Sequence, residues 1–307
     1  MLFSGTSHPQ LAEEIAKSLG IGLGEVLIEK FPDGEIGVQI LENVRGRDVF
    51  VVQSIAKKPN LYLMELLILI DALKRASARR IVTVISYYGY ARQDRKDKGR
   101  VPITAKLVAD LLEKAGVARV VTMDLHSEQI QGFFDIPVDN LYARPILVEA
   151  LKNCSIEKPV VVTPDIGSIK LARITASDMG ADFAIVDKKR LNSTEVEMQA
   201  LIGDVQGRDV ILVDDICSTG STLRNASLAC RKAGAKRIFA AVTHGIFDGG
   251  PPKGSEIDRL FVTNTVPLLD EIDRSQVEIV SVAELFGKAI KFIIENESVS
   301  SLFRPAT

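Results

Sequence analysis

The chain has 307 residues, of which 46% are hydrophobic and 25% charged, and its formal net charge is −2. This composition predicts a soluble globular protein with room for two domains, and the pI near 6.0 argues against a nucleic-acid coat or a membrane-surface protein. Three scattered cysteines provide neither a disulfide framework nor a zinc site, so we expect a cytoplasmic protein.

Neither the start of the chain nor its most apolar segment indicates a membrane. The first twenty residues lack a basic stretch followed by an apolar one, so no secretory signal is predicted. Residues 61–73 are mostly apolar, but Glu65 and Asp71 interrupt them and the run is too short to span a bilayer. A helix buried between a sheet and a partner surface is the simpler interpretation.

Short aliphatic runs alternate with helical patterns along the chain. The runs are rich in Val and Ile without polar alternation, which is typical of parallel strands buried on both faces. Residues 103–116 and 221–234 have helical spacing and end in Ala-Gly. The pattern predicts an α/β fold with one open sheet in each half, divided into residues 1–147 and 148–307. The predicted strands are residues 48–54, 80–86, 119–124, 159–165, 183–188, 209–215 and 237–244.

The run VDDICSTGSTL, residues 213–223, joins a predicted strand to a predicted helix. Backbone N–H groups at a helix N-terminus attract anions, hydroxyl side chains add donors, and a glycine allows close approach. A Walker A ending is absent, whereas two carboxylates suit a ribose diol. The run therefore predicts a site for a sugar phosphate; the alternative is a capped helix beside two solvated acids. The candidate residues are Asp214, Asp215, Ser218, Thr219, Gly220, Ser221 and Thr222.

This run resembles the ribose-phosphate loop of type I phosphoribosyltransferases and of ribose-phosphate pyrophosphokinases. Further segments favour the second family: FPDGEIGVQI at 31–40, the RQDRK stretch at 92–96, and DLHSEQIQGFFDIPVDNL at 124–141. The resemblance covers nearly the whole chain, including its last residues. It implies two phosphoribosyltransferase-like domains, with the last residues packing back on the N-terminal one.

The resemblance also implies a nucleotide side of the site. The residues that would contact ATP are Phe31, Asp33, Glu35, Arg92 and Gln93. The ring of Phe31 would stack on adenine. From the residues alone, Pro-Asp-Gly at 32–34 is a turn and the basic run at 92–100 is a solvated loop.

Two residues are carried over as Mg²⁺ sites and two as catalytic cations. His126 would help to hold Mg²⁺ at the nucleotide, and Asp165 would serve the metal and the sugar-phosphate region. Without the resemblance, a lone histidine is more often structural, and residues 163–173 are an ordinary strand, turn and helix. Lys188 and Arg190 correspond to the family's catalytic loop; the alternative is a solvated basic loop.

The implied enzyme is a ribose-phosphate diphosphokinase that moves diphosphate from ATP to the C1 hydroxyl of ribose 5-phosphate and releases AMP. A phosphoribosyltransferase and a non-catalytic regulatory paralogue are the alternatives. The resemblance further implies a homo-oligomer, a hexamer built from dimers. The composition predicts no nucleic-acid or membrane partner.

The chain departs from the family pattern at three positions. Ser168 replaces the second glycine of a PDxGG pattern, Ser218 stands where many members carry an acid, and Glu128 stands where a small residue is common near a regulatory anion site. A carboxylate repels phosphate, so Glu128 predicts weak or altered activation by inorganic phosphate. Cys217 lies in the phosphate loop and is expected to be a small buried residue.

Overall fold

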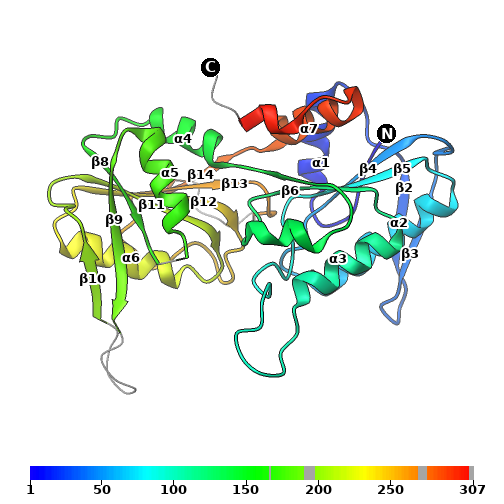
Figure 1. Cartoon of the computed structure of the whole chain (residues 1–307). Helices are drawn as coiled ribbons and strands as arrows, with labels where there is room; N and C mark the ends of the chain where they lie inside the picture. The colour runs from blue at the N-terminus through cyan, green and yellow to red at the C-terminus, as the bar shows by residue number, and fades with distance from the viewer. Residues whose placement is uncertain (166, 190–197, 269–274, 304–307) are drawn as a thin grey trace. The chain divides into compact units, whose positions relative to one another are not determined.

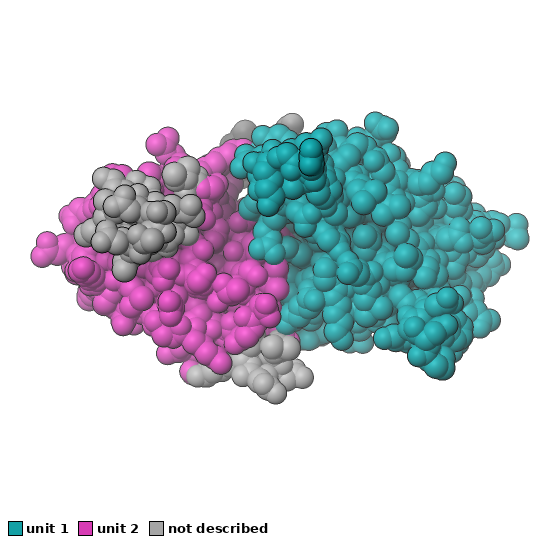
Figure 2. Space-filling view, turned by 90° about the horizontal axis from the view of Figure 1, so that it is seen from below, with its two compact units in different colours: residues 1–142, 265–267, 281–307 teal, residues 143–264, 268–280 magenta. Residues whose placement is uncertain are grey.

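The computed structural model describes residues 1–165, 167–189, 198–268 and 275–303, with the backbone alone for 187–189 and 198–200 (Figure 1). The chain forms two compact units, coloured separately in Figure 2. Unit 1 comprises residues 1–142, 265–267 and 281–307, and unit 2 comprises residues 143–264 and 268–280. We describe each unit by itself.

Unit 1 is built on a five-stranded parallel sheet of order β1-β4-β5-β6-β7. The strands are β1 (Leu2–Ser4), β4 (Asp48–Gln53), β5 (Arg80–Ile85), β6 (Arg119–Met123) and β7 (Val138–Leu141). Four helices flank the sheet: α1 (Pro9–Leu19), α2 (Pro59–Arg75), α3 (Thr104–Ala115) and α7 (Ala283–Glu295). A hairpin of β2 (Val26–Lys30) and β3 (Ile36–Ile40), and the short 3₁₀ helices η1 (Glu128–Phe133) and η2 (Val299–Phe303), complete the unit.

The C-terminal helix α7 belongs to unit 1 and packs against α1. Gly287 makes the close approach possible, because a Cβ atom there would lie 2.2 Å from Ser18 Oγ. The Ser281 hydroxyl also donates to Glu14 Oε2 at 2.7 Å. Residues from the two ends of the chain thus form one packed layer, as Figure 1 shows in blue and red.

Unit 2 is built on a seven-stranded sheet of order β10-β9-β8-β11-β12-β13-β14, parallel except for the edge strand β10. Its strands are β8 (Pro159–Thr163), β9 (Asp182–Lys189), β10 (Met198–Ile202), β11 (Asp209–Cys217), β12 (Arg237–Gly245), β13 (Arg259–Thr263) and β14 (Val277–Val280). Its helices are α4 (Arg144–Lys152), α5 (Ile169–Met179) and α6 (Ser221–Lys232).

Strand β11 shows why these sequences lack alternation. Val210 and Leu212 pack into a core cluster with Leu223 of α6, while Val213 lines a cavity with α4 and α5. Both faces of the strand are covered by helices, so both sets of side chains are apolar. The predicted α/β class is confirmed, and each of the seven predicted strands is present to within two residues at either end.

Both sheets begin with an ion pair between neighbouring strands. Asp48 and Arg80 are register partners at the start of β4 and β5, and their side chains meet at 2.8 Å. Asp209 and Arg237 hold the same positions in β11 and β12 and also form an ion pair. The amino ends of the two sheets are therefore fixed in the same way.

Among the described residues, no helix combines the length and the apolar composition that a membrane span needs.

Candidate active site

The candidate sugar-phosphate site lies at the carboxyl end of β11, where parallel α/β sheets commonly bind ligands. Asp214 and Asp215 are part of this strand, because β12 continues alongside it as far as the pair Cys217–Gly245. The strand holds the backbone of both acids in place, and α6 begins four residues after Cys217.

The turn between β11 and α6 depends on Gly220. Its φ is 75°, in the left-handed region, and a Cβ atom there would lie 2.8 Å from Pro252 Cγ and 2.9 Å from Pro252 Cα. Gly220 is the N-cap of α6 and has no side chain to cap the helix, although Thr219 Oγ1 accepts a long hydrogen bond from Ser221 N at 3.4 Å. Apart from this long bond at Ser221, the start of the helix can therefore offer backbone N–H groups to an anion.

Hydroxyl groups surround this helix start. Thr219 and Ser221 are exposed and their hydroxyl oxygens are 3.1 Å apart. Ser218 and Thr222 are half-buried, and the Ser218 carbonyl accepts from Asp248 N at 2.9 Å. The predicted loop residues are thus brought together on one turn, next to the open end of a helix.

The two acids differ in environment. Asp214 is only 8% exposed, and its Oδ1 accepts from the Ser168 hydroxyl at 2.6 Å and from Asp215 N at 3.1 Å. Burial raises the pKa of Asp214 above its usual range, and the nearby charges of Asp215 and Asp165 raise it further. Asp215 is half-buried. Asp215 is therefore the more accessible of the pair for a sugar hydroxyl, and Asp214 lies behind it.

Asp165 follows the neighbouring strand β8. Its backbone carbonyl accepts from the Thr163 hydroxyl at 2.5 Å, and its Oδ1 accepts from Ser168 N at 3.2 Å. The three carboxylates Asp165, Asp214 and Asp215 interact electrostatically at the carboxyl ends of adjacent strands. A cationic partner, from a metal or from a substrate–metal complex, would relieve this repulsion.

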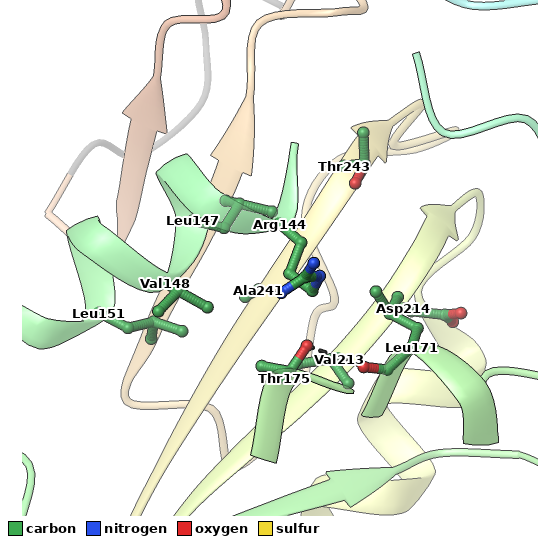
Figure 3. Close-up of a pocket in the computed structure, with 10 residues that line it drawn as sticks. All are labelled: Arg144, Leu147, Val148, Leu151, Leu171, Thr175, Val213, Asp214, Ala241 and Thr243. Carbon is green, nitrogen blue, oxygen red and sulfur yellow. Dashed lines mark hydrogen bonds between the residues drawn. The ribbon is translucent and has the colours of Figure 1, made fainter. Parts of the chain in front are cut away.

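A cavity of about 10 Å³ lies on the core side of Asp214 (Figure 3). Aliphatic side chains of α4 and α5 line it, together with Arg144, Thr175 and Thr243. Its volume suits about one water molecule and is far too small for a sugar phosphate. The cavity is therefore a packing feature behind the site rather than the substrate pocket.

Cys217 is only 2% exposed, and burial raises the pKa of its thiol to about 12. The neutral thiol is a poor nucleophile. The expectation of a small buried residue is confirmed.

In unit 1, Phe31 follows β2 at the turn of the β2–β3 hairpin. Gly34 N donates to the Phe31 carbonyl, and Asp33 Oδ1 accepts from Glu35 N at 3.1 Å, so the interpretation of 32–34 as a turn is confirmed. Phe31 is 45% exposed, and the neighbouring Gly37 leaves room for its ring. An exposed ring on a hairpin provides a stacking surface, with Asp33 and Glu35 exposed beside it.

Arg92 and Gln93 lie between β5 and α3, and both are exposed. Gln93 Oε1 accepts from the Thr104 hydroxyl at 2.5 Å, at the start of α3. This contact uses the oxygen of the Gln93 amide, so its NH₂ group can still donate a hydrogen bond.

His126 is exposed just beyond β6. The chain turns at Asp124, whose φ is 38°, and Leu125 N donates to Asn140 Oδ1 at 3.1 Å. This turn carries His126 past the carboxyl end of the sheet. His126 belongs to unit 1 and Asp165 to unit 2, so the two predicted metal residues are not brought together within either unit.

Within the described ranges, no group of three or more His, Cys, Asp or Glu side chains forms a ready metal cage. Magnesium is commonly held by one or two carboxylates together with substrate phosphates, so an oxygen donor such as Asp165 suits it without a cage. Lys188 lies in β9 with its backbone alone described, and Arg190 lies outside the described residues.

The contact between Ser168 and Asp214 could not be predicted from the sequence, because the two residues are 46 positions apart. It also did not indicate Pro252, which closes over Gly220. A departure from the family pattern was the only signal at Ser168.

Comparisons with known proteins cover nearly the whole chain. Residues 1–116 match the N-terminal domain of ribose phosphate pyrophosphokinase, and residues 181–304 match the phosphoribosyl synthetase-associated domain. The ribose-phosphate pyrophosphokinase of Wolinella succinogenes is 51% identical over 305 residues, covering 98% of both chains. That of Vibrio cholerae is 49% identical over 308 residues, again covering 98% of both.

A solved structure agrees with these relatives. The crystal structure of phosphoribosylpyrophosphate synthetase from Mycobacterium smegmatis has a TM-score of 0.92 and 41% identity, and the match covers 96% of this chain and 99% of that one. The resemblance stated from the sequence is therefore confirmed, with the transferase class that it implied. The chain belongs to the ribose-phosphate pyrophosphokinase family.

Proposed function

We propose that this chain transfers diphosphate from ATP to the C1 hydroxyl of ribose 5-phosphate, giving 5-phosphoribosyl 1-diphosphate and AMP. The observation that carries the proposal is the sequence identity of 51% and 49% to two ribose-phosphate pyrophosphokinases. The alignments cover 98% of the chain, including the segments that bear the candidate residues. The sugar-phosphate geometry of Asp214–Thr222 supports the same substrate.

Ribose 5-phosphate is assigned to the end of β11 and the start of α6. The N–H groups at the start of α6 and the hydroxyls of Thr219 and Ser221 suit its phosphate. Asp215, the more accessible acid, suits the ribose diol, and Asp214 supports it from behind.

ATP is assigned to unit 1. The exposed ring of Phe31 suits adenine, with Asp33 and Glu35 beside it, and Arg92 and Gln93 suit its phosphates. This assignment follows the resemblance, and the exposure of all five side chains is compatible with it.

His126 and Asp165 are the residues that we assign to Mg²⁺. When bound to ATP, the ion neutralises charge on the phosphates. His126 is exposed at a strand end, and Asp165 offers an oxygen ligand beside two further acids.

Lys188 and Arg190 are assigned the role of neutralising the negative charge that develops on the transferring group. Phosphoryl transfer depends on positioning and charge neutralisation more than on covalent chemistry. No nucleophile on the protein is needed, since the sugar's own hydroxyl attacks the β-phosphorus. We further propose a cytoplasmic homo-oligomer, a hexamer built from dimers, as the resemblance implies.

The test is to incubate the purified chain with ATP, Mg²⁺ and ribose 5-phosphate and to quantify AMP and 5-phosphoribosyl 1-diphosphate. We expect equal amounts of both, and none when ribose 5-phosphate or Mg²⁺ is omitted. AMP without the sugar product would contradict the reaction. An absence of both products would favour the regulatory paralogue, and turnover only with 5-phosphoribosyl 1-diphosphate and a nucleobase would favour a phosphoribosyltransferase.

Lys188→Ala tests the catalytic assignment. Removing one charge-stabilising group should lower kcat by about 10²–10³-fold with little change in ribose 5-phosphate binding. Lys189→Ala, next to it in β9, is the matched control. Unchanged turnover in Lys188→Ala would reject the role.

A further inference from the structure

The hydroxyl of Ser168 is used in an unusual way. Ser168 is the N-cap of α5, a position where a serine side chain normally accepts from the N–H groups of the first helical turn. Here it makes no such bond. Its hydroxyl instead donates to Asp214 Oδ1 at 2.6 Å, across 46 residues of sequence.

The backbone of the same residue holds a second carboxylate. Ser168 N donates to Asp165 Oδ1 at 3.2 Å. Ser168 therefore contacts, through two separate donors, an acid at the end of β8 and an acid at the end of β11. The residue is 8% exposed, so these bonds are largely shielded from water.

The contact fixes one oxygen of Asp214. Ser168 Oγ and Asp215 N both donate to Oδ1, and this pair of bonds sets the plane of the Asp214 carboxyl group. The Asp214 carboxyl in turn lies against that of Asp215, the more accessible acid. A glycine at 168 would keep the backbone bond to Asp165 and lose the hydroxyl bond to Asp214.

We propose that Ser168 is a positioning residue of the sugar-phosphate site, whose hydroxyl orients Asp214 and, through it, Asp215 toward the ribose of ribose 5-phosphate. The inference rests on the proposed function, since it takes ribose 5-phosphate as the ligand of this turn. Ser168 itself touches no reacting atom and acts through the acids.

Two variants remove the hydroxyl. Ser168→Ala deletes it, and Ser168→Gly deletes it while keeping a residue that is well tolerated at an N-cap. Losing this buried hydrogen bond leaves Asp214 without the contact that orients it, so ribose 5-phosphate binding should weaken about tenfold in both variants. The KM for ATP should stay within about twofold, because the ATP assignment lies elsewhere.

Ser227→Ala is the matched control. Ser227 is fully buried in the same unit, and its hydroxyl donates to the Arg224 carbonyl at 2.7 Å and accepts from Glu256 N, away from the acids. Its loss should lower the melting temperature as a buried hydroxyl does, without changing ribose 5-phosphate affinity.

The measurements are the dissociation constant of ribose 5-phosphate by titration calorimetry, both KM values, kcat, and the melting temperature, for the full chain and the three variants. A selective loss of sugar affinity in both Ser168 variants, absent from Ser227→Ala, is the expected result. Equal affinity in the wild type and both Ser168 variants would overturn the proposal, as would an equal loss for ATP and for ribose 5-phosphate. If the wild type itself neither binds ribose 5-phosphate nor forms AMP, the proposed function fails first.

Discussion

The turn at Gly220 yields a prediction that the structure quantifies. Replacing Gly220 with alanine places a side chain at φ 75°, where left-handed backbone costs an L-residue about 1–2 kcal/mol. The added Cβ would also lie 2.8 Å from Pro252 Cγ and 2.9 Å from Pro252 Cα, and the second of these is backbone that cannot swing aside. Relieving such a clash typically costs about 1–3 kcal/mol. Together we expect Gly220→Ala to lower the free energy of unfolding by about 2–5 kcal/mol.

Gly180→Ala separates the two contributions. Gly180 ends α5 with φ 59°, and a Cβ atom there meets nothing within 4 Å. It carries the backbone cost alone, so we expect about 1–2 kcal/mol. The difference between the variants then measures the contact with Pro252.

The assay is urea unfolding of the wild type and both variants, followed by fluorescence and by circular dichroism to check that the transitions coincide. Ribose 5-phosphate affinity is measured in parallel. Gly220→Ala should lose affinity as well as stability, because the turn that presents the N–H groups of α6 must shift. A Gly220→Ala variant no less stable than Gly180→Ala would refute the reasoning about Pro252.

Three further predictions concern stability, thiol reactivity and regulation. Burial alone would raise the pKa of Asp209, but hydrogen bonds from Arg237 and from a backbone N–H bring it below the usual value. The ionised Asp209 carboxylate therefore stabilises the fold fully above the unfolded-state pKa of about 3.9. This stabilisation is lost as pH falls through the lower pKa of the folded state. Asp209→Asn should cost about 1.5–3 kcal/mol at pH 7, because the Arg237 left behind is partly exposed, and the gap to wild type in urea midpoints should narrow below pH 4; a constant gap would contradict this. A maleimide at pH 7 should label half-buried Cys154 and spare Cys217 until the chain unfolds, as peptide mapping would show; rapid labelling of folded Cys217 would be inconsistent with its raised pKa. Exposed Glu128 should make activation by inorganic phosphate weak, so a phosphate titration of initial rate should stay nearly flat, and Glu128→Ser should steepen it; strong activation of the wild type would reject the idea.

The fold was largely predictable because its strands are long and buried on both faces. The run at 209–215 has no alternation, and in the structure α6 covers one face of β11 while α4 and α5 cover the other. Short elements escaped prediction for the opposite reason. β1 has three residues and β7 has four, too few to show a period, and the exposed hairpin β2–β3 carries a turn signal but weak alternation.

The candidate site was predictable where its residues are adjacent in sequence. The hydroxyl-rich turn could be read from one run, since strand, glycine and helix follow each other directly. The different burial of Asp214 and Asp215 could not be predicted, because it depends on segments distant in sequence, such as the one that carries Ser168. The contact from Ser168 depends on β8 lying next to β11, which only the sheet order reveals.

The packing of α7 on α1 has a consequence for how the protein is made. Residues 1–142 leave the ribosome before unit 2, yet unit 1 also includes residues 265–267 and 281–307, the second of which emerges after all of unit 2. Nascent unit 1 therefore has an uncovered α1 surface around Ser18 during nearly all of translation, while unit 2 requires nothing beyond residue 280. Unit 2 is therefore the first unit whose residues have all been synthesised. This order is the reverse of the usual one, in which the N-terminal domain folds first. A stop codon shortly before Ala283 would therefore leave unit 1, the first part to be synthesised, without the helix that covers α1.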